Sequence, residues 1–103
     1  MNKEKAKSAY EELGFPDAPE MQVKAQLVVK IEKILSDRGY SQQQAAKIMG
    51  LTQPRLSKML HGQFRGISEA KLMECLIRLG CEVKIVVRPK RKSASTKVEV
   101  VAA

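Results

Sequence analysis

The sequence predicts an all-α domain of four to five helices with a single β-strand near its C-terminal end. Three observations support this fold class. Apolar residues recur every three or four positions through most of the chain, as on the buried face of a helix. Ser, Thr and Gly stand at the ends of these stretches, where helices are commonly capped, and the spacing becomes alternating only near residue 83.

The charge of the chain favours a polyanionic partner. Its 103 residues, enough for one domain with modest tails, include 19 Lys and Arg against 11 Asp and Glu, a formal net charge of +8. We expect double-stranded DNA rather than a membrane, because there is no long amphipathic helix with a Lys/Arg face. No stretch approaches the roughly 18 apolar residues of a membrane span, and nothing resembles a signal peptide, so we expect a cytoplasmic protein.

The sequence offers little material for catalysis or metal binding. Cys75, Cys81 and the single histidine, His61, are too few and too poorly spaced for a zinc site, so we expect inert packing thiols and no cofactor. There is no nucleophile–base pair, carboxylate cluster or glycine-rich phosphate loop. The chain is therefore not expected to be an enzyme.

We expect three parts: an N-terminal arm (1–15), a domain with the features of a DNA-binding unit described below (16–89) and a basic flexible tail (90–103). The first helix is expected to begin with Asp17 as its cap and to end at Gly39. Its apolar face is predicted to leave the lysines, among them Lys24, on the other side. Three further helices are predicted at Gln42–Met49, Gln53–Leu60 and from Ser68 through Leu79, with Ser41, Thr52 and Ser68 as caps and Gly50 and Gly80 as stops. The last of these helices counts Ile77 among its apolar residues, and Glu74 and Arg78 form an i,i+4 pair on its solvent side.

Residues 42–61 carry the functional motif, a helix, a short glycine-containing turn and a second helix. The small side chain of Ala46 allows the two helices to cross closely, and Gly50 tolerates the positive φ of a tight reversal. Leu56 and Met59 then face the core. This pattern matches a helix-turn-helix, whose second helix enters the major groove. The alternative is an ordinary corner between two helices with a solvated polar face.

The outer face of this second helix is polar. Gln53 and Arg55 are expected to read bases, because Gln pairs with adenine and Arg with guanine through two hydrogen bonds. The expected phosphate contacts are Gln42, Gln43, Thr52, Ser57 and Lys58. His61 either contacts a phosphate or caps the C-terminal end of its helix.

A strand is predicted at residues 82–88, where Val83, Ile85 and Val87 alternate with more polar neighbours. A single strand leaves its backbone groups unpaired, so we expect it to pair with the same strand of a second copy. The two reading helices of the dimer would then lie about 34 Å apart on a palindromic operator. The alternative is pairing within the chain, with residues 97–101. The Met1–Phe15 arm either binds a partner protein or folds onto the first helix.

Several segments resemble the Xre/Cro family of helix-turn-helix regulators, and in particular a branch of HigA-type antitoxins from toxin–antitoxin modules. They are Leu13–Ala18, Lys24–Leu27, Thr52–Ser57, Leu60–Gly66 and Val83–Pro89, and the similarity spans roughly residues 10 to 89. The resemblance implies a lambda-repressor-like fold and a transcriptional repressor acting on its own promoter. The alternative it implies is an antitoxin whose main task is to neutralise a RelE/HigB-like toxin.

The resemblance also assigns positions within the motif. The base-reading positions of the family fall on Thr52, Gln53, Arg55 and Lys58. Pro54 occupies a place where many family members carry a polar reader.

Overall fold

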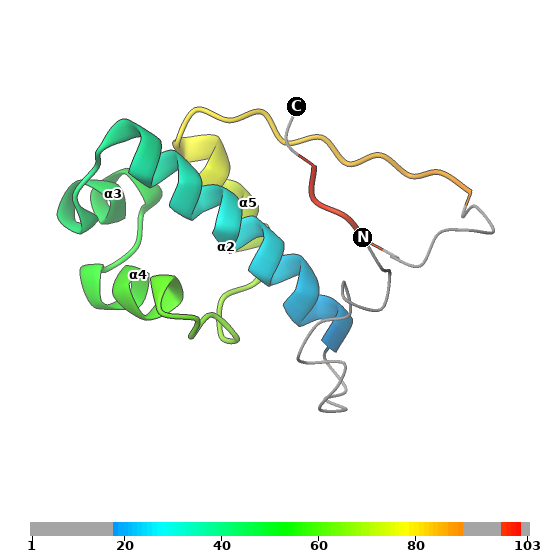
Figure 1. The fold of residues 1–103 in the computed structure, drawn as a ribbon, viewed down its shortest axis with the longest axis horizontal. Coiled ribbons are helices and arrows are strands. Elements are labelled where there is room, and N and C mark those ends of the chain that lie inside the picture. Colours follow the sequence, from blue (N-terminus) through cyan, green and yellow to red (C-terminus); the bar gives the residue numbers. More distant parts are fainter. Residues whose placement is uncertain (1–17, 90–97, 102–103) are drawn as a thin grey trace.

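The computed structural model describes residues 18–89 and 98–101. Within them the chain forms four helices: α2 (Ala18–Arg38), α3 (Gln42–Met49), α4 (Gln53–Leu60) and α5 (Glu69–Arg78) (Figure 1). The predicted all-helical domain is therefore present. The arm at residues 1–15, Asp17 and most of the predicted tail lie outside the described residues.

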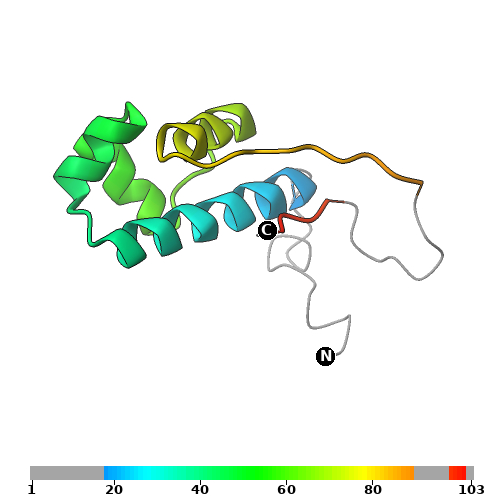
Figure 2. The ribbon, with the colours of Figure 1, turned by 90° about the horizontal axis from the view of Figure 1, so that it is seen from above.

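Helix α2 is the longest element, and the other three helices pack against it or against one another. Helix α5 lies along α2, while α3 and α4 lie together at the side that is on the left in Figures 1 and 2. Helix α2 ends at Arg38, and the φ of 67° at Gly39 lets the chain reverse while the Tyr40 amide donates to the Leu35 carbonyl. The helix-turn-helix is thus held at one side of an α2–α5 layer.

Short polar side chains set the starts of the three shorter helices. The Ser41 hydroxyl accepts from the Gln44 amide, and the Gln44 side chain accepts from the Ser41 amide, which completes a capping box. Thr52 caps α4 by accepting from the Arg55 amide, and Ser68 caps α5 by accepting from the Lys71 amide. These are the caps that the sequence predicts.

One hydrophobic core joins all four helices. Met49 of α3, Leu56 and Met59 of α4, and Leu72 and Cys75 of α5 are fully buried. Phe64 and Ile67, in the connection between α4 and α5, are buried in the same core although the sequence indicated only a glycine-containing loop there. The helix-turn-helix therefore depends on α2 and α5 for its apolar contacts.

Two expectations about helix faces were wrong. Lys24 was placed on the outer side of α2, but only 4% of it is exposed, and its Nζ donates to the Arg65 carbonyl at 2.7 Å and lies 3.5 Å from Glu20 Oε1. Ile77 was placed on the apolar face of α5 but is 57% exposed. The buried face of α5 follows Leu72, Cys75 and Leu76, which leaves Ile77 on another side.

The predicted strand at residues 82–88 is not formed in the single chain. The backbone is irregular from Cys81 to Pro89, and its residues 82–89 make no backbone–backbone hydrogen bond to other described residues. A strand needs a neighbour, and no described segment supplies one. Figure 1 shows this segment as an extended trace that leaves the end of α5. The side chains along it are exposed, 76% for Ile85 and 90% for Val87.

The alternative pairing within the chain is also not seen among the described residues. Val98–Val101 contacts α2 instead: the Val100 amide donates to Gln26 Oε1 at 2.6 Å, and Gln26 Nε2 donates to the Val98 carbonyl at 3.4 Å. Within residues 18–89 and 98–101, no helix is both long and apolar enough to cross a membrane.

Candidate nucleic-acid interface

Helices α3 and α4 cross at small side chains and are joined by a tight turn. Ala45 and Ala46 are buried, so the two helices approach closely. Gly50 has a φ of 70°, and both its amide and that of Leu51 donate to the Ala46 carbonyl. Leu51 is buried inside the turn. The turn is thus closed by backbone hydrogen bonds and anchored by an apolar side chain.

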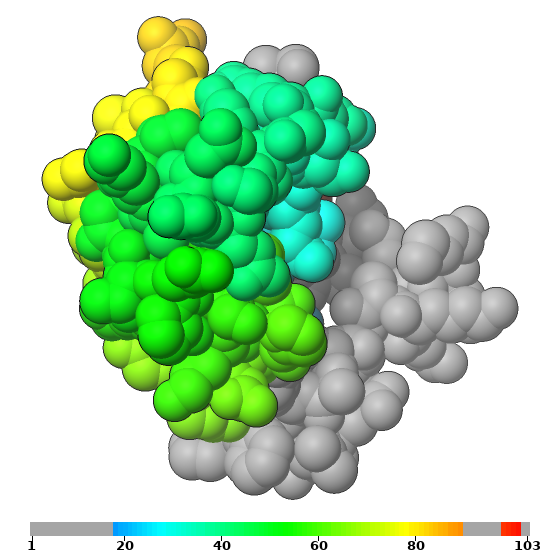
Figure 3. Space-filling model, turned by 90° about the vertical axis from the view of Figure 1, so that its left-hand side faces the viewer, coloured from blue at the N-terminus to red at the C-terminus, as the bar shows by residue number. Residues whose placement is uncertain are grey.

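Helix α4 has one buried and one polar face. Leu56 and Met59 face the core, and the opposite face carries exposed polar or charged side chains beside Pro54. Figure 3 views this side, where α3 and α4 form a continuous, outwardly rounded surface without a deep hollow. The residues predicted to read bases, Thr52, Gln53, Arg55 and Lys58, are all exposed, whereas Ser57 is half-buried.

Thr52 has two possible uses. Its Oγ1 accepts from the Arg55 amide at 3.3 Å as the cap of α4. A hydroxyl that accepts one hydrogen bond can still donate its proton, so Thr52 can contact an acceptor on DNA while it caps the helix.

The start of α3 offers a second set of polar groups. Gln42 and Gln43 are exposed on the first turn, directly after the Ser41 cap. The amides of a first helical turn carry partial positive charge and suit a phosphate. Gln44 is committed to the capping box, so Gln42 and Gln43 are the glutamines of this turn that remain available.

His61 follows the last residue of α4 and forms its C-terminal cap. Its backbone amide donates to the Ser57 and Lys58 carbonyls, and its Nδ1 lies 2.6 Å from the Ser57 carbonyl oxygen as a hydrogen-bonding partner. The capping role weighed for this histidine is thus present. Because a carbonyl oxygen only accepts, Nδ1 is the donor in this contact, and a phosphate contact by Nε2 requires that this nitrogen also carry a proton.

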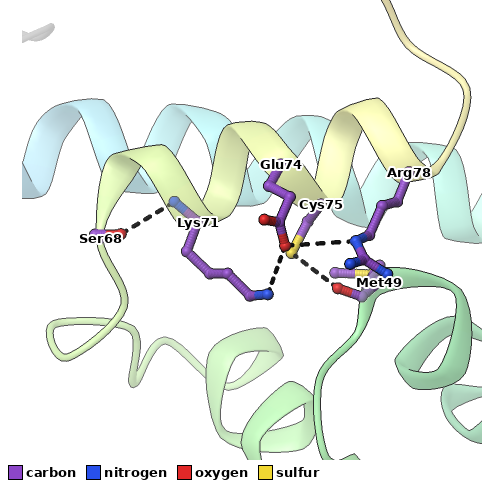
Figure 4. Close-up of polar contacts among 6 residues, drawn as sticks. All are labelled: Met49, Ser68, Lys71, Glu74, Cys75 and Arg78. Carbon is purple, nitrogen blue, oxygen red and sulfur yellow. Dashed lines mark hydrogen bonds and ion pairs between the residues drawn. The ribbon is translucent and has the colours of Figure 1, made fainter.

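A cluster of charges on α5 flanks the motif (Figure 4). Glu74 Oε2 lies 2.6 Å from Lys71 Nζ and 3.4 Å from Arg78 Nε. The hydrogen bond and charge of Lys71 lower the pKa of Glu74, with a smaller contribution from Arg78. The i,i+4 spacing of Glu74 and Arg78 predicted their ion pair. The second ion pair of Glu74, with Lys71, was not predicted.

Cys75 lies on the same helix as this cluster and contacts the end of α3. Its Sγ lies 3.7 Å from the Met49 carbonyl at the end of α3. Burial raises the pKa of the thiol, while the positive charges of Lys71, Arg78 and Arg55 act in the opposite direction.

Two open depressions lie on the described surface. One of about 370 Å³ is lined by Met21 and the loop that follows α4, and one of about 280 Å³ lies where Val100 meets α2. Neither coincides with the polar face of α4. Among residues 18–89 and 98–101, no three His, Cys, Asp or Glu side chains come together as metal ligands would.

Comparison with known proteins agrees with this architecture. Residues 9–88 match a family described as a helix-turn-helix domain. A solved structure described as an XRE family transcriptional regulator is 36% identical to the chain and superposes with a TM-score of 0.79, covering 85% of this chain and 100% of that one. No curated protein gives a match. The chain therefore belongs to the XRE family of helix-turn-helix proteins.

Proposed function

We propose that the chain is a sequence-specific DNA-binding regulator that represses transcription as a homodimer on a palindromic operator. One observation carries the proposal: the polar face of α4 is exposed, while the opposite face of that helix is locked into the core by Leu56 and Met59. A rigid helix that presents hydrogen-bonding side chains on a rounded surface fits the major groove.

Base reading is assigned to Gln53 and Arg55, with Thr52 and Lys58 beside them. Gln53 is the first residue of α4, where a side chain reaches deepest into a groove that the helix enters by its N-terminal end. Arg55 carries the guanidinium that pairs with guanine. Pro54 has no polar side chain, so it reads no base by hydrogen bonding.

Phosphate contacts are assigned to both sides of α4. Gln42 and Gln43, at the start of α3, would hold one phosphate together with the first-turn amides. Ser57 and His61, nearer the end of α4, would contact another. The net charge of +8 favours these contacts and makes binding depend on salt.

Dimerisation is assigned to residues 82–88. In the single chain, Ile85, Val86 and Val87 are exposed, and the backbone of the segment has no partner among the described residues. Val83 is half-buried and packs against the core, so the segment begins at a fixed point. Antiparallel pairing with a second copy would satisfy the backbone groups and shield the apolar side chains.

Repression of the chain's own promoter is the simplest use of such a dimer, since a bound protein blocks access to the DNA. The antitoxin alternative needs a surface for a second protein. The arm at residues 1–15, to which that contact was provisionally assigned, lies outside the described residues. The exposed polar face of α4 favours DNA binding, and co-purification of the product of an adjacent gene would favour the alternative.

Selection of duplexes from a random DNA library by the full chain tests the proposal. A palindromic consensus is expected, and Gln53→Ala and Arg55→Ala should each weaken binding to it by about 1–3 kcal/mol and relax the preference at one base position. Lys33→Ala removes an exposed positive charge on α2 and is the control for the charge lost in Arg55→Ala. If the wild-type chain enriches no sequence, the proposal is wrong.

A further inference from the structure

Arg78 of α5 lies directly over the turn of the helix-turn-helix. A Cβ built on Gly50 would lie 3.1 Å from Arg78 Nη1 and 3.2 Å from its Cζ, so the guanidinium rests against the glycine. This approach leaves little room for a side chain at residue 50. A side chain at residue 50 would therefore have to shift this guanidinium by a few tenths of an ångström, in addition to adopting a φ of 70°.

The orientation of Arg78 is set within α5. Its Nε lies 3.4 Å from Glu74 Oε2, and the same carboxylate oxygen binds Lys71 Nζ at 2.6 Å (Figure 4). Glu74 is therefore held from both sides along the helix. Although half of the Arg78 side chain is exposed, its guanidinium is directed at the turn by this pair.

The contact also suits the electrostatics of α3. Gly50 follows Met49, the last residue of that helix, where the carbonyl ends carry partial negative charge. A positive guanidinium at this end is favourable. Cys75 reaches the Met49 carbonyl from the same face of α5, so two side chains one turn apart contact the end of α3.

We propose that Arg78 is a positioning residue for the DNA-reading helix. It holds the turn that joins α3 to α4 and thereby fixes the direction in which α4 presents Gln53 and Arg55; this role rests on the DNA-binding function proposed above. Arg78 acts through Gly50, without needing to touch a base itself. Groups that hold a reading side chain in place contribute to specificity although they make no contact with the ligand.

Hydrogen exchange in the free, full-length chain tests the first part. The Gly50 and Leu51 amides both donate to the Ala46 carbonyl, so they report whether the turn is closed. Arg78→Gln should speed their exchange by about fivefold or more, while the Tyr40 amide, which closes the end of α2, keeps its rate. Lys33→Gln removes one charge from another i,i+4 ion pair and should leave all three rates unchanged.

Affinity for two duplexes tests the second part, one selected from a random library by the wild-type chain and one a scrambled duplex of equal length. On the selected duplex, Arg78→Gln should bind about tenfold more weakly than Lys33→Gln. On the scrambled duplex, the two variants should lose the same affinity relative to the wild type. Arg78→Lys keeps the charge but not the planar guanidinium, and should retain the loss of specificity.

Three outcomes would overturn the proposal. The first is unchanged exchange at Gly50 and Leu51 in Arg78→Gln. The second is equal weakening on both duplexes with recovery in Arg78→Lys, which would mark a phosphate contact. The third is faster exchange with no loss of specificity beyond that of Lys33→Gln. If the wild-type chain selects no sequence, the DNA-binding function fails, and with it the role in reading, while exchange still shows whether Arg78 holds the turn.

Discussion

Lys24 Nζ lies 2.7 Å from the carbonyl oxygen of Arg65 and joins α2 to the loop that follows α4. The lysine is buried, and Glu20 lies one turn before it on the same helix, 3.5 Å from Nζ. A backbone carbonyl held by a charged donor is fixed more firmly than one held by a neutral donor. The contact therefore ties the end of the motif to the longest helix of the domain.

Replacement of Lys24 by Met should lower the free energy of unfolding by about 1–3 kcal/mol. The apolar stem is kept, but the Arg65 carbonyl loses its charged donor. Urea denaturation followed by circular dichroism measures the change. Lys33→Met, which breaks an exposed ion pair on the same helix, should cost about 0.5 kcal/mol or less, and an equal cost for both variants would contradict the assigned role.

Gly50→Ala should destabilise the fold more than Gly39→Ala. The two glycines have nearly the same φ, 70° and 67°, and each substitution carries a backbone penalty of about 1–2 kcal/mol. An added Cβ meets nothing within 4 Å at Gly39 but meets the Arg78 guanidinium at Gly50. Thermal denaturation measures the difference, and Arg78→Ala in the Gly50→Ala background should remove part of it.

Ile85→Asp should give a monomer with much weaker binding to the selected operator. A buried carboxylate in a two-stranded interface would be costly, whereas in the single chain this side chain is 76% exposed. Light scattering at micromolar protein concentration measures the mass of both forms. Lys84→Asp alters charge at the neighbouring, exposed position and serves as the control. A wild-type chain that is monomeric at this concentration would refute the dimer.

Acid should destabilise the domain partly through Glu74. Because its pKa is lowered in the folded state, its contribution is complete above its ordinary value of 4.5 and disappears as the pH falls through the lower, folded value. Glu74→Gln should therefore lose less stability than the wild type between about pH 6 and about pH 3. Glu32→Gln removes an exposed negative charge on α2 and is the control for the charge lost in Glu74→Gln. Parallel curves for wild type and Glu74→Gln would contradict this assignment.

The two cysteines should react with a thiol reagent at different rates. Cys75 is fully buried and burial raises its pKa, whereas Cys81 is only half-buried. The reaction with an aromatic disulfide, followed by the absorbance of the aromatic thiolate that it releases, should proceed in two phases. Cys81→Ser should remove the fast phase. A fast phase that persists in this variant would show that the Cys75 thiol is reached without unfolding.

Local signals explain why the helices could be predicted from the sequence. Ser41, Thr52 and Ser68 act within three residues of themselves, and Gly50 acts through its own φ. Such features do not depend on the rest of the fold. The polar outer face of α4 follows from the same helical spacing, which is why its exposed residues could be named in advance.

Contacts between distant segments explain what the sequence did not reveal. The partner of Lys24 is a backbone carbonyl 41 residues away, and the pattern of side chains in the sequence does not indicate such a contact. Arg78 looked like a solvent-side partner of Glu74, and its approach to Gly50 depends on how α5 packs on α3. The segment at residues 82–88 has the spacing of a strand, but a strand also requires a neighbour that this chain does not provide among its described residues.

The shortness of α3 and α4 has a consequence for turnover in the cell. Helices of eight residues are too short to persist in water alone, so the surface they form exists only while the shared core is intact. A cleavage that unfolds the core would therefore also remove this surface. Under the proposed repressor function, release of the controlled gene would follow the number of intact molecules, and degradation of the chain would act directly on expression.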